Sequence, residues 1–206
     1  MPYKKNYSTK RRYSSKKYIV KPKRIWSVYR QHGKGNMFAP IQSDFPAGYD
    51  FLTKYEVKDI IQNLRDDVNI PQAVRTIKHL KVELARSYTG CGETMRQACM
   101  KMKAYLLYLP QGVTFNSTMN KETMLAETLS SHPEWVLSEK SINSMFNTNT
   151  YSTTNHTINC KLSKNLRSGD RIALVIAASF DPNILGSTDN SKTPINFNYE
   201  YTYACC

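Results

Sequence analysis

Hydrophobic and polar residues alternate one by one in several segments of the chain, which is typical of a β-strand with one buried face. The pattern is clearest in residues 195–203, where isoleucine, phenylalanine and three tyrosines occupy every second position between asparagine, glutamate and threonine. The same alternation predicts strands over residues 77–87, 99–109 and 156–162. Residues 171–179 are apolar at nearly every position, which predicts a central strand buried on both faces.

Two other segments have the spacing of short helices. Apolar residues recur three and four positions apart within residues 54–67, which predicts an amphipathic helix. The residues that set this spacing are Val57, Ile60, Ile61 and Leu64. Residues 121–131 show a similar spacing and are followed by Pro133, which ends a helix. We expect a further strand from Trp135, and loops with two small strands in the Asn-, Ser- and Thr-rich residues 144–155.

The number of expected strands decides the fold class. Two short helices cannot alternate with so many strands, so a parallel α/β sheet is excluded and an all-β sandwich or barrel of antiparallel strands remains. Periodicity alone leaves a jelly roll, an immunoglobulin-like sandwich and other sandwiches open. We expect the sandwich domain over residues 37–206, with residues 37–76 as a lead-in segment that carries the first short helix.

Charge divides the chain into two unequal parts. There are 29 Lys and Arg against 16 Asp and Glu. Residues 1–36 hold 12 of these bases and no acid, so the other 170 residues hold 17 bases and 16 acids. We expect residues 1–36 to form a basic arm that is disordered on its own, because its charges repel one another. Such an arm predicts a polyanionic partner.

Aromatic residues lie between the basic clusters of the arm and refine this prediction. Lysine and arginine can pair with phosphates while aromatic rings stack on unpaired bases, which favours a single-stranded nucleic acid over a duplex. The candidate nucleic-acid-binding residues are Lys4, Lys5, Lys10, Arg11, Arg12, Lys16, Lys17, Lys21, Lys23, Arg24, Arg30, Lys34, Tyr7, Tyr13, Tyr18 and Trp26. The alternative is that the Lys/Arg runs are a nuclear import signal, which is compatible with nucleic-acid binding.

The sequence contains no recognisable catalytic or metal-binding constellation. The four histidines stand far apart, and there is no zinc-protease, serine-hydrolase or P-loop motif. The five cysteines lack paired Cys-x-x-Cys spacing. We therefore expect no enzyme, no cofactor and no structural metal, and we expect Cys160 to face the core.

Neither a membrane span nor a secretion signal is predicted. The longest wholly apolar run is residues 172–178, whereas a membrane-spanning helix needs about 20 apolar residues. The polar, basic N-terminal segment has no apolar stretch of the kind that drives secretion, so we expect a reducing compartment and reduced thiols.

Residues 162–177 carry a resemblance to a known family. They read LSKNLRSGDRIALVIA, in which a Leu-Ser-basic-Asn-Leu stretch and a Ser-Gly-Asp turn lead into an apolar strand. This resembles a recurring segment in capsid proteins of circular, Rep-encoding single-stranded DNA viruses, the circovirus-like group. The Lys/Arg/Tyr arm, the strand ending in Tyr108-Leu-Pro-Gln-Gly-Val and the Tyr-rich last strand follow in matching order.

The resemblance implies a single jelly roll that assembles as about 60 copies into a small icosahedral, T=1-like shell, with the arm pointing inward onto a single-stranded DNA genome. It also implies a virion protein that passes through the host nucleus, with host import machinery and a cell-surface receptor as further partners. In a jelly roll the first and last strands pair antiparallel, so residues 77–87 are expected to share the core with residues 195–203.

Two other functions compete with the capsid hypothesis. One is a cellular nucleic-acid-binding protein with a basic tail, either ribosomal or chromatin-associated, and the other is a jelly-roll lectin or enzyme. A cellular factor would usually carry excess basic charge on its folded surface as well, which this near-neutral body does not. A capsid subunit would bury apolar loop residues against its copies. The candidates for that burial are Trp135, Phe146, Phe180 and Leu185.

Overall fold

The computed structural model describes residues 26–38, 52–62, 74–87, 99–113, 129–142, 153–161, 163–181, 183 and 195–206. Most of these residues lie in β-strands. The strands are β1 (Ser27–Met37), β2 (Leu52–Gln62), β3 (Arg75–Ser87), β4 (Cys99–Leu109), β5 (Val136–Ile142), β6 (Thr153–Cys160), β7 (Lys164–Leu166), β8 (Arg171–Phe180) and β9 (Ile195–Cys205). A short 3-10 helix, η2 (Pro133–Trp135), precedes β5.

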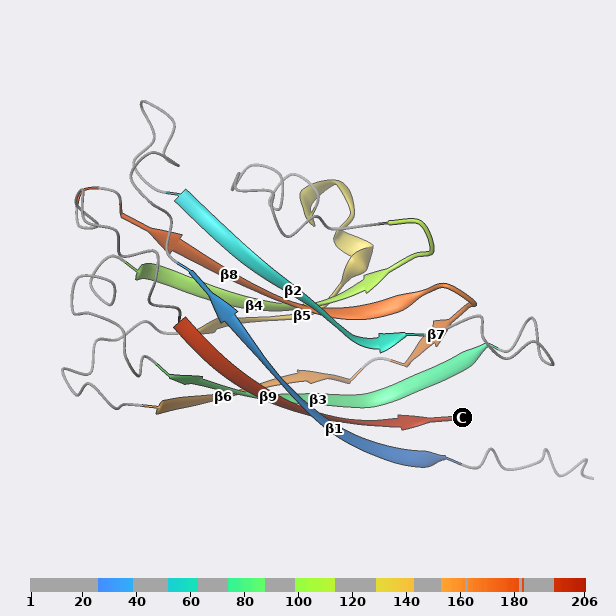
Figure 1. Cartoon of the computed structure of the whole chain (residues 1–206). Helices are drawn as coiled ribbons and strands as arrows, with labels where there is room; N and C mark the ends of the chain where they lie inside the picture. Colours follow the sequence, from blue (N-terminus) through green and yellow to red (C-terminus); the bar gives the residue numbers. More distant parts are fainter. Residues whose placement is uncertain are drawn as a thin grey trace, which may run out of the picture.

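The strands form two antiparallel sheets that lie one above the other (Figure 1). Sheet A has the order β1-β9-β3-β6, with β7 added beside β3, and sheet B has the order β2-β8-β4-β5. The pairs are nested along the chain, because β1 pairs with β9, β2 with β8, β3 with β6 and β4 with β5. This nesting is the topology of a jelly roll, so the expected fold is confirmed.

The predicted pairing of residues 77–87 with residues 195–203 is also confirmed. β3 runs antiparallel to β9, with Leu84 opposite Tyr199 and Val82 opposite Tyr201. However, β3 is not the first strand of the roll. β9 lies between β1 and β3, and β1 takes the place that the sequence analysis gave to residues 77–87.

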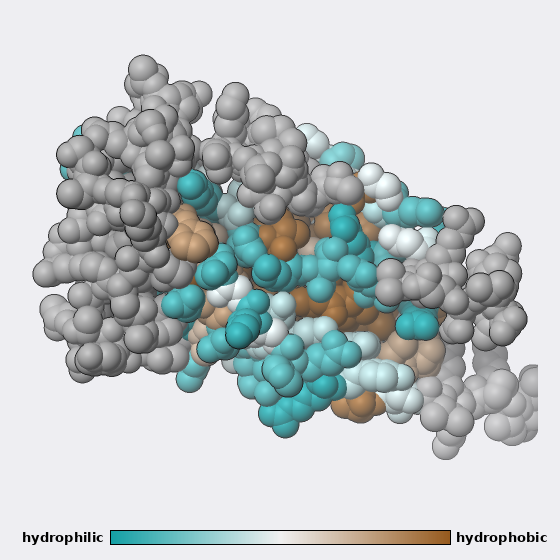
Figure 2. Space-filling view, viewed as in Figure 1, coloured by the Kyte–Doolittle hydropathy of each residue, from teal (hydrophilic) through white to brown (hydrophobic). Residues whose placement is uncertain are grey.

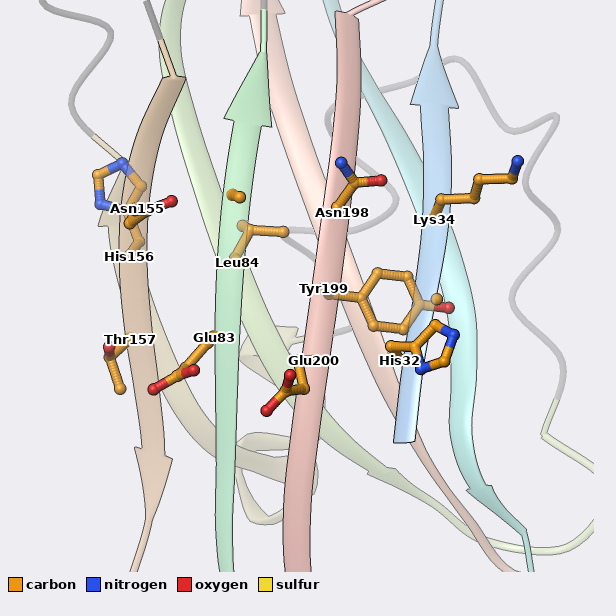
Figure 3. A pocket seen from close by; sticks show the side chains of 12 residues that line it. His32, Lys34, Glu83, Leu84, Asn155, His156, Thr157, Asn198, Tyr199 and Glu200 are labelled. Atoms are coloured by element: carbon orange, nitrogen blue, oxygen red, sulfur yellow. The ribbon is translucent and has the colours of Figure 1, made fainter. Parts of the chain in front are cut away.

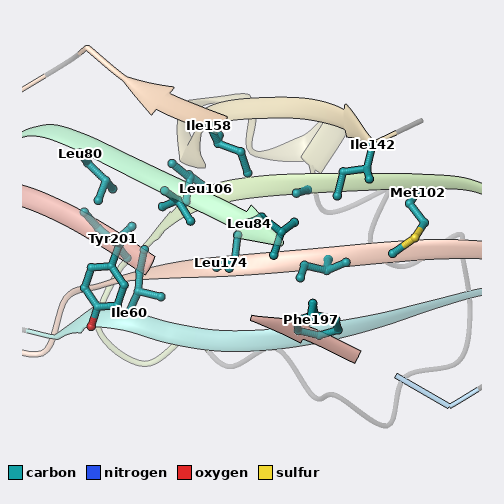
Figure 4. Packing of buried hydrophobic residues seen from close by; sticks show 14 of the residues in the cluster. Ile60, Leu80, Leu84, Met102, Leu106, Ile142, Ile158, Leu174, Phe197 and Tyr201 are labelled. Atoms are coloured by element: carbon teal, nitrogen blue, oxygen red, sulfur yellow. The ribbon is translucent and has the colours of Figure 1, made fainter. Parts of the chain in front are cut away.

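The core lies between the inner faces of the two sheets (Figure 4). Fully buried side chains from both sheets meet there, and Cys160 is among the buried residues, as expected. Examples that Figure 4 labels are Leu84 and Phe197 of sheet A and Leu106 and Leu174 of sheet B. Each such side chain contributes roughly 1.5–3 kcal/mol by leaving water, which makes this layer the main source of stability.

Several strand predictions are confirmed in place. The segments predicted from alternation correspond to β3, β4, β6 and β9, and the strand expected from Trp135 is β5. The apolar residues 171–179 lie in β8, which is central in sheet B between β2 and β4. Residues on both faces of β8 are buried, which explains why its sequence does not alternate.

The helix predicted over residues 54–67 is wrong, because residues 52–62 form β2. A β-bulge between Asp59 and Ile61 shifts the register, so that Ile60 and Ile61 both reach the core. Val57 lies on the opposite face of the sheet. The bulge therefore produces a spacing of three and four residues in a strand, which imitates a helix.

The expectation that residues 1–36 form one disordered arm is wrong for residues 27–36, which lie in β1. The alternation of β1 is hidden because Gly33 and Gly35 occupy positions that face β9 side chains. A Cβ atom at Gly33 would lie 2.4 Å from the ring of Tyr199, and one at Gly35 would lie 2.3 Å from the ring of Phe197. Aromatic side chains of β9 thus fill the space that β1 side chains would otherwise occupy.

The remaining expectations have mixed outcomes. Phe180, expected in a loop at a subunit contact, is a fully buried residue of β8. Trp135 is half-buried, and its ring stacks on that of His132 at 4.0 Å. Phe146 and Leu185 lie outside the described residues, as do residues 1–25 of the arm. Of the helix expected over residues 121–131, only residues 129–131 are described, and these are helical.

Candidate nucleic-acid interface

Three of the sixteen candidate binding residues fall in the described part of the chain: Trp26, Arg30 and Lys34. The other thirteen lie in residues 1–25, outside the described residues. Arg30 and Lys34 lie four residues apart on the same face of β1, and both are exposed. That face is the outer face of sheet A, directed away from the core.

Cross-strand register arranges the outer face of sheet A in rows that run from β1 through β9 and β3 to β6. One row consists of His32, Glu200, Glu83 and Thr157. The next consists of Lys34, Asn198, Ala85 and Asn155. A third consists of Arg30, Thr202, Lys81 and Asn159. Residues that face each other in such rows have their Cβ atoms about 5 Å apart, so each row is a continuous strip of side chains.

The first two rows line a groove of about 860 Å³ (Figure 3). Ala85 provides a low floor between longer neighbours, because a methyl group leaves space between Asn198 and Asn155. Amide groups, carboxylates, an imidazole and an ammonium group surround this floor. The groove is therefore rich in hydrogen-bond donors and acceptors, although carbon atoms also form a large part of its surface.

The Arg30 guanidinium is held on this face by a carboxylate. Its Nε donates a hydrogen bond to Glu200 Oε1 at 2.6 Å, and its Nη2 donates one to Oε2 at 2.9 Å. These hydrogen bonds lower the pKa of Glu200. The pair is solvent-exposed, so it orients Arg30 without adding much stability. Lys81 forms an ion pair with Glu83, which lies two residues further along β3.

Trp26 lies at the point where residues 1–25 join β1. The Nζ of Lys78, on β3, lies 3.5 Å from the centre of the Trp26 ring. This cation–π contact fixes the indole at the end of the outer face. The sequence pattern does not single out Lys78, although it occupies an outward position in the alternating segment 77–87, because only the pairing of β3 with β9 brings it near Trp26.

Aromatic contacts on the inner face hold β1 in place. The ring of Tyr29 stacks on that of Tyr203 at 5.2 Å. The Tyr201 hydroxyl donates a hydrogen bond to Gln31 Oε1 at 2.5 Å. Burial raises the pKa of Tyr201 to about 12, so the hydroxyl keeps its proton at neutral pH. β1 is thus bound to β9 by side chains as well as by the backbone ladder.

Viewed from the β1 and β2 edge, the described surface of sheet A is mainly hydrophilic, and hydrophobic residues show between the two sheets (Figure 2). Larger exposed apolar residues gather at one corner of sheet A. Val28 is 77% exposed and lies opposite Ala204, which in turn lies opposite Lys78. Val74, just before β3, is 52% exposed. The corner at which the arm joins the sheet is therefore apolar with a basic rim.

The resemblance motifs meet at a buried carboxylate. Asp170 accepts hydrogen bonds from the Tyr108 hydroxyl at 2.8 Å, from the Gln111 backbone N–H at 3.1 Å and from the Arg167 backbone N–H at 2.8 Å. It thereby joins the turn before β8 to the turn after β4. Gly169 has a φ of +85°, as expected for this tight turn. Burial and the bond to Asp170 raise the pKa of Tyr108 to about 12.

Within the described residues, no group of three or more His, Cys, Asp or Glu side chains could hold a metal ion. The same part of the chain has no helix that is both long and apolar enough to cross a membrane.

No protein-family model matches the chain, and no curated protein sequence matches it. Solved structures with some similarity include the BFDV capsid protein crystallised as a 60-mer, with a TM-score of 0.40, 10% identity, and coverage of 88% of this chain and 92% of that chain. The decameric BFDV capsid protein has a TM-score of 0.36 and 9% identity, with coverage of 88% of this chain and 98% of that chain. The structure of Desmodium yellow mottle tymovirus has a TM-score of 0.33 and 12% identity, with coverage of 99% of this chain and 96% of that chain.

Proposed function

We propose that this chain is a structural capsid subunit that packages single-stranded nucleic acid. Many copies of the jelly roll assemble into a small icosahedral shell of about 60 subunits. Residues 1–25 project into the shell and bind the genome together with the outer face of sheet A. The resemblance of residues 162–177 to circovirus-like capsid proteins supports DNA as the packaged polymer, the virion as the destination and the host nucleus as the assembly site.

The observation that carries the proposal is the separation of charge along the chain. Residues 1–25 contain 10 Lys and Arg and no acid, so the remaining 181 residues contain 19 bases and 16 acids. A subunit of a filled shell needs a body that can approach its copies without strong repulsion and a segment that neutralises a polyanion. This chain supplies the two properties in separate segments.

The outer face of sheet A supports a role in binding the same polymer. β1 is continuous with the basic segment, so a strand of nucleic acid held by residues 18–25 would reach the groove next. Lys34 in the groove, and Lys78 beside Trp26 at the end of the same face, can contact phosphates. Asn155 and Asn198 in the groove can hydrogen-bond to exposed base edges. A duplex would hide those base edges, so this face favours single strands, as do the tyrosines of the arm.

Self-association has its own support in the exposed apolar corner of sheet A. Val28 and Val74 are more exposed than large apolar side chains usually are, and they lie beside the same sheet end. An apolar surface with a basic rim is typical of a protein–protein contact rather than of a surface that stays in water.

The groove also keeps the lectin alternative testable. Two amides, two carboxylates and a histidine could hydrogen-bond to a hydroxyl-rich ligand, and such a ligand would need no positive charge. Binding of a neutral oligosaccharide that survives deletion of residues 1–25 and is lost in Asn198→Ala would favour a lectin.

The direct test of packaging is deletion of residues 1–25. This cut preserves β1, whereas deletion of residues 1–36 would also remove a strand of sheet A. Binding to a single-stranded oligonucleotide should be titrated at several salt concentrations. Each phosphate contact adds about −0.7 to the slope of log affinity against log salt, so half of the 10 cations would contribute about −3.5. A truncated body that retains the full-length slope would show that the arm does not bind the polymer.

Assembly needs a separate measurement, because a capsid subunit could assemble poorly and still bind nucleic acid. Sedimentation and electron microscopy of the full-length protein should show uniform small spheres at neutral pH and moderate salt. A protein that stays monomeric at high concentration would contradict the capsid function while leaving nucleic-acid binding in place.

A further inference from the structure

Basic residues of the body gather around β7, where it pairs with β3. Residues 74–82 and 153–169 together hold six Lys and Arg and no Asp or Glu. The fold brings these two segments together, because β7 pairs with the first residues of β3 and β6 pairs with later ones. Lys81 forms an ion pair with Glu83, and we call the other five cations the β7 patch. The β7 patch consists of Arg75, Lys78, Lys161, Lys164 and Arg167.

The described carboxylates of the body pair with other cations. In the part of the chain that the structure describes, no residue of the β7 patch forms an ion pair with a carboxylate. The Lys and Arg ion pairs found there are Lys58–Glu56, Lys81–Glu83, Arg171–Asp59 and Arg30–Glu200. Asp170, next to the patch in sequence, is buried and accepts hydrogen bonds from a hydroxyl and two backbone N–H groups. Glu134 of η2 interacts electrostatically with Lys164, but one carboxylate offsets only part of five positive charges.

Two ammonium groups of the β7 patch lie on aromatic rings. The Nζ of Lys78 is 3.5 Å from the centre of the Trp26 ring, and that of Lys164 is 3.8 Å from the centre of the Tyr108 ring. A cation–π contact orients an ammonium group without cancelling its charge, so both groups can still attract a phosphate. The other three cations of the patch are exposed. The patch therefore combines accessible cations with aromatic rings, as the sequence of the arm does.

The β7 patch lies at the end of the sandwich where the arm joins the body (Figure 1). Ser27, Cys205, Ile77 and Lys164 form one cross-strand row from the first residue of β1 to the first residue of β7. Neighbouring strands are about 4.8 Å apart, so this row crosses sheet A within roughly 15 Å. Trp26, just before β1, already contacts the patch. The patch is therefore close to the path of a polymer that runs from residues 1–25 toward the groove.

We propose that the β7 patch binds the sugar–phosphate backbone of single-stranded nucleic acid, so that the body itself holds the polymer beside the arm. This inference rests on the proposed function, because it takes the polymer to be the one that residues 1–25 bind. The cations are spread along β3 and β7 rather than gathered around one point, which suits a chain of phosphates better than a single small anion. Contacts to phosphates fix the position of a polymer without reading its bases, so binding at the patch is independent of base sequence.

The test removes the three exposed cations of the patch from the full-length protein. The patch variant carries Arg75→Gln, Lys161→Gln and Arg167→Gln. Binding of a single-stranded oligonucleotide is titrated at several salt concentrations, and the slope of log affinity against log salt should flatten by about 2, since each phosphate contact contributes about 0.7. The control variant removes the same charge from β4 and β5 of sheet B and should keep the wild-type slope. It carries Lys101→Gln, Lys103→Gln and Lys140→Gln.

The outcomes separate the β7 patch from the arm. Equal flattening in the patch and control variants would show an effect of net charge and would exclude the patch as a site. If deletion of residues 1–25 flattens the slope while the patch variant keeps the wild-type slope, the proposed function stands and the β7 patch is excluded. If the patch variant loses binding to a sulfated polysaccharide but binds the oligonucleotide as the wild type does, the patch serves another polyanion and the proposal is wrong.

A second measurement needs no variant and so does not depend on the folding of one. Lysines of the full-length protein are acetylated with and without a short oligonucleotide and are then identified by mass spectrometry. The conditions are those in which sedimentation shows the same oligomeric state in both samples. Lys161 and Lys164 should lose reactivity when the oligonucleotide is bound, whereas Lys101 and Lys140 should keep it. Protection of the lysines in residues 1–25 without protection of Lys161 and Lys164 would exclude the β7 patch and leave binding by the arm in place.

Discussion

The outer faces of the two sheets differ sharply, although both belong to the same sandwich. The outer face of sheet A consists of rows of amides, hydroxyls and paired charges around a groove. The outer face of sheet B is a second apolar cluster that includes Tyr55, Leu107 and Val175, against which Leu129 and Trp135 pack. Sheet A thus has one buried face and sheet B has two.

This difference shows which outward side chains of each sheet are needed for packing. Sheet B is fixed on both sides by packing, so its outward residues behave as core residues. Sheet A is fixed by its inner face alone, which leaves its outer side chains free to serve binding. The candidate nucleic-acid interface therefore lies on the sheet whose outer side chains are not packed into a hydrophobic cluster.

The largest effect is expected for a charge placed on the outer face of sheet B. Val175 is fully buried in β8, between Val57 of β2 and Tyr105 of β4. Val175→Asp should lower the free energy of unfolding by about 4 kcal/mol, because it places a carboxylate among buried apolar side chains. Thr202→Asp, placed between Arg30 and Lys81 on sheet A, should change it by less than about 1 kcal/mol. If urea unfolding showed the same loss of unfolding free energy for both variants, the outer faces of the two sheets would not differ in this way.

A smaller change should show the same asymmetry. Leu107 is fully buried on the outer face of β4, opposite Ala173. Leu107→Ala should cost about 2–4 kcal/mol, since it removes buried methyl groups and leaves a cavity. Thr157→Ala, on the outer face of sheet A, should stay within about 0.5 kcal/mol. Thermal unfolding of both variants would measure the difference, and a mild effect of Leu107→Ala would show that the second cluster is loosely packed.

Substitution of the glycines in β1 tests how closely this edge strand packs against β9 in sheet A. Gly35→Ala should cost about 1–3 kcal/mol, because the ring of Phe197 is 1% exposed and cannot move aside. Gly33→Ala should cost less, since the atoms it meets are the outer end of the half-buried Tyr199 ring. If urea unfolding showed the same loss of stability for both substitutions, the ability of the aromatic ring to move aside would not determine the loss.

The smallest effect on stability is expected for the ion pair on the groove face. Arg30→Gln should leave the unfolding midpoint unchanged, because an exposed pair contributes little. The same change should flatten the salt dependence of oligonucleotide binding by about 0.7. Glu200→Gln should instead strengthen binding, since it releases Arg30 from its carboxylate. If neither variant alters binding, the outer face of sheet A is not part of the interface.

The sequence predicts the strands whose two faces differ strongly in polarity. β9 and β3 alternate because one face meets the core and the other meets water, and β8 is recognised by its apolar run. β1 does not show the pattern, because the inward positions of Gly33 and Gly35 are filled by side chains of another strand. β2 has the spacing of a helix because a bulge shifts its register, and a bulge is set by pairing with β8 rather than by local preference.

The candidate site shows a similar limit. The basic residues of the arm are evident from charge alone. The groove is not, because its rows join β1, β9, β3 and β6, which are distant in the sequence and meet only through the register of the jelly roll. Asp170 can be recognised as a turn residue from the sequence, but its hydrogen bond to Tyr108 depends on the pairing of β8 with β4, which brings the start of one strand beside the end of the other.

The position of β1 at the edge of sheet A has a mechanical consequence. A polymer that binds residues 1–25 pulls on the first residue of a strand that is paired along 11 residues with β9. A pull along the strand axis loads the whole ladder in shear, so many hydrogen bonds resist it together. A pull perpendicular to the edge would peel the ladder one pair at a time, beginning at Ser27 and Cys205. The direction in which the chain leaves β1 therefore determines how much tension the body can withstand.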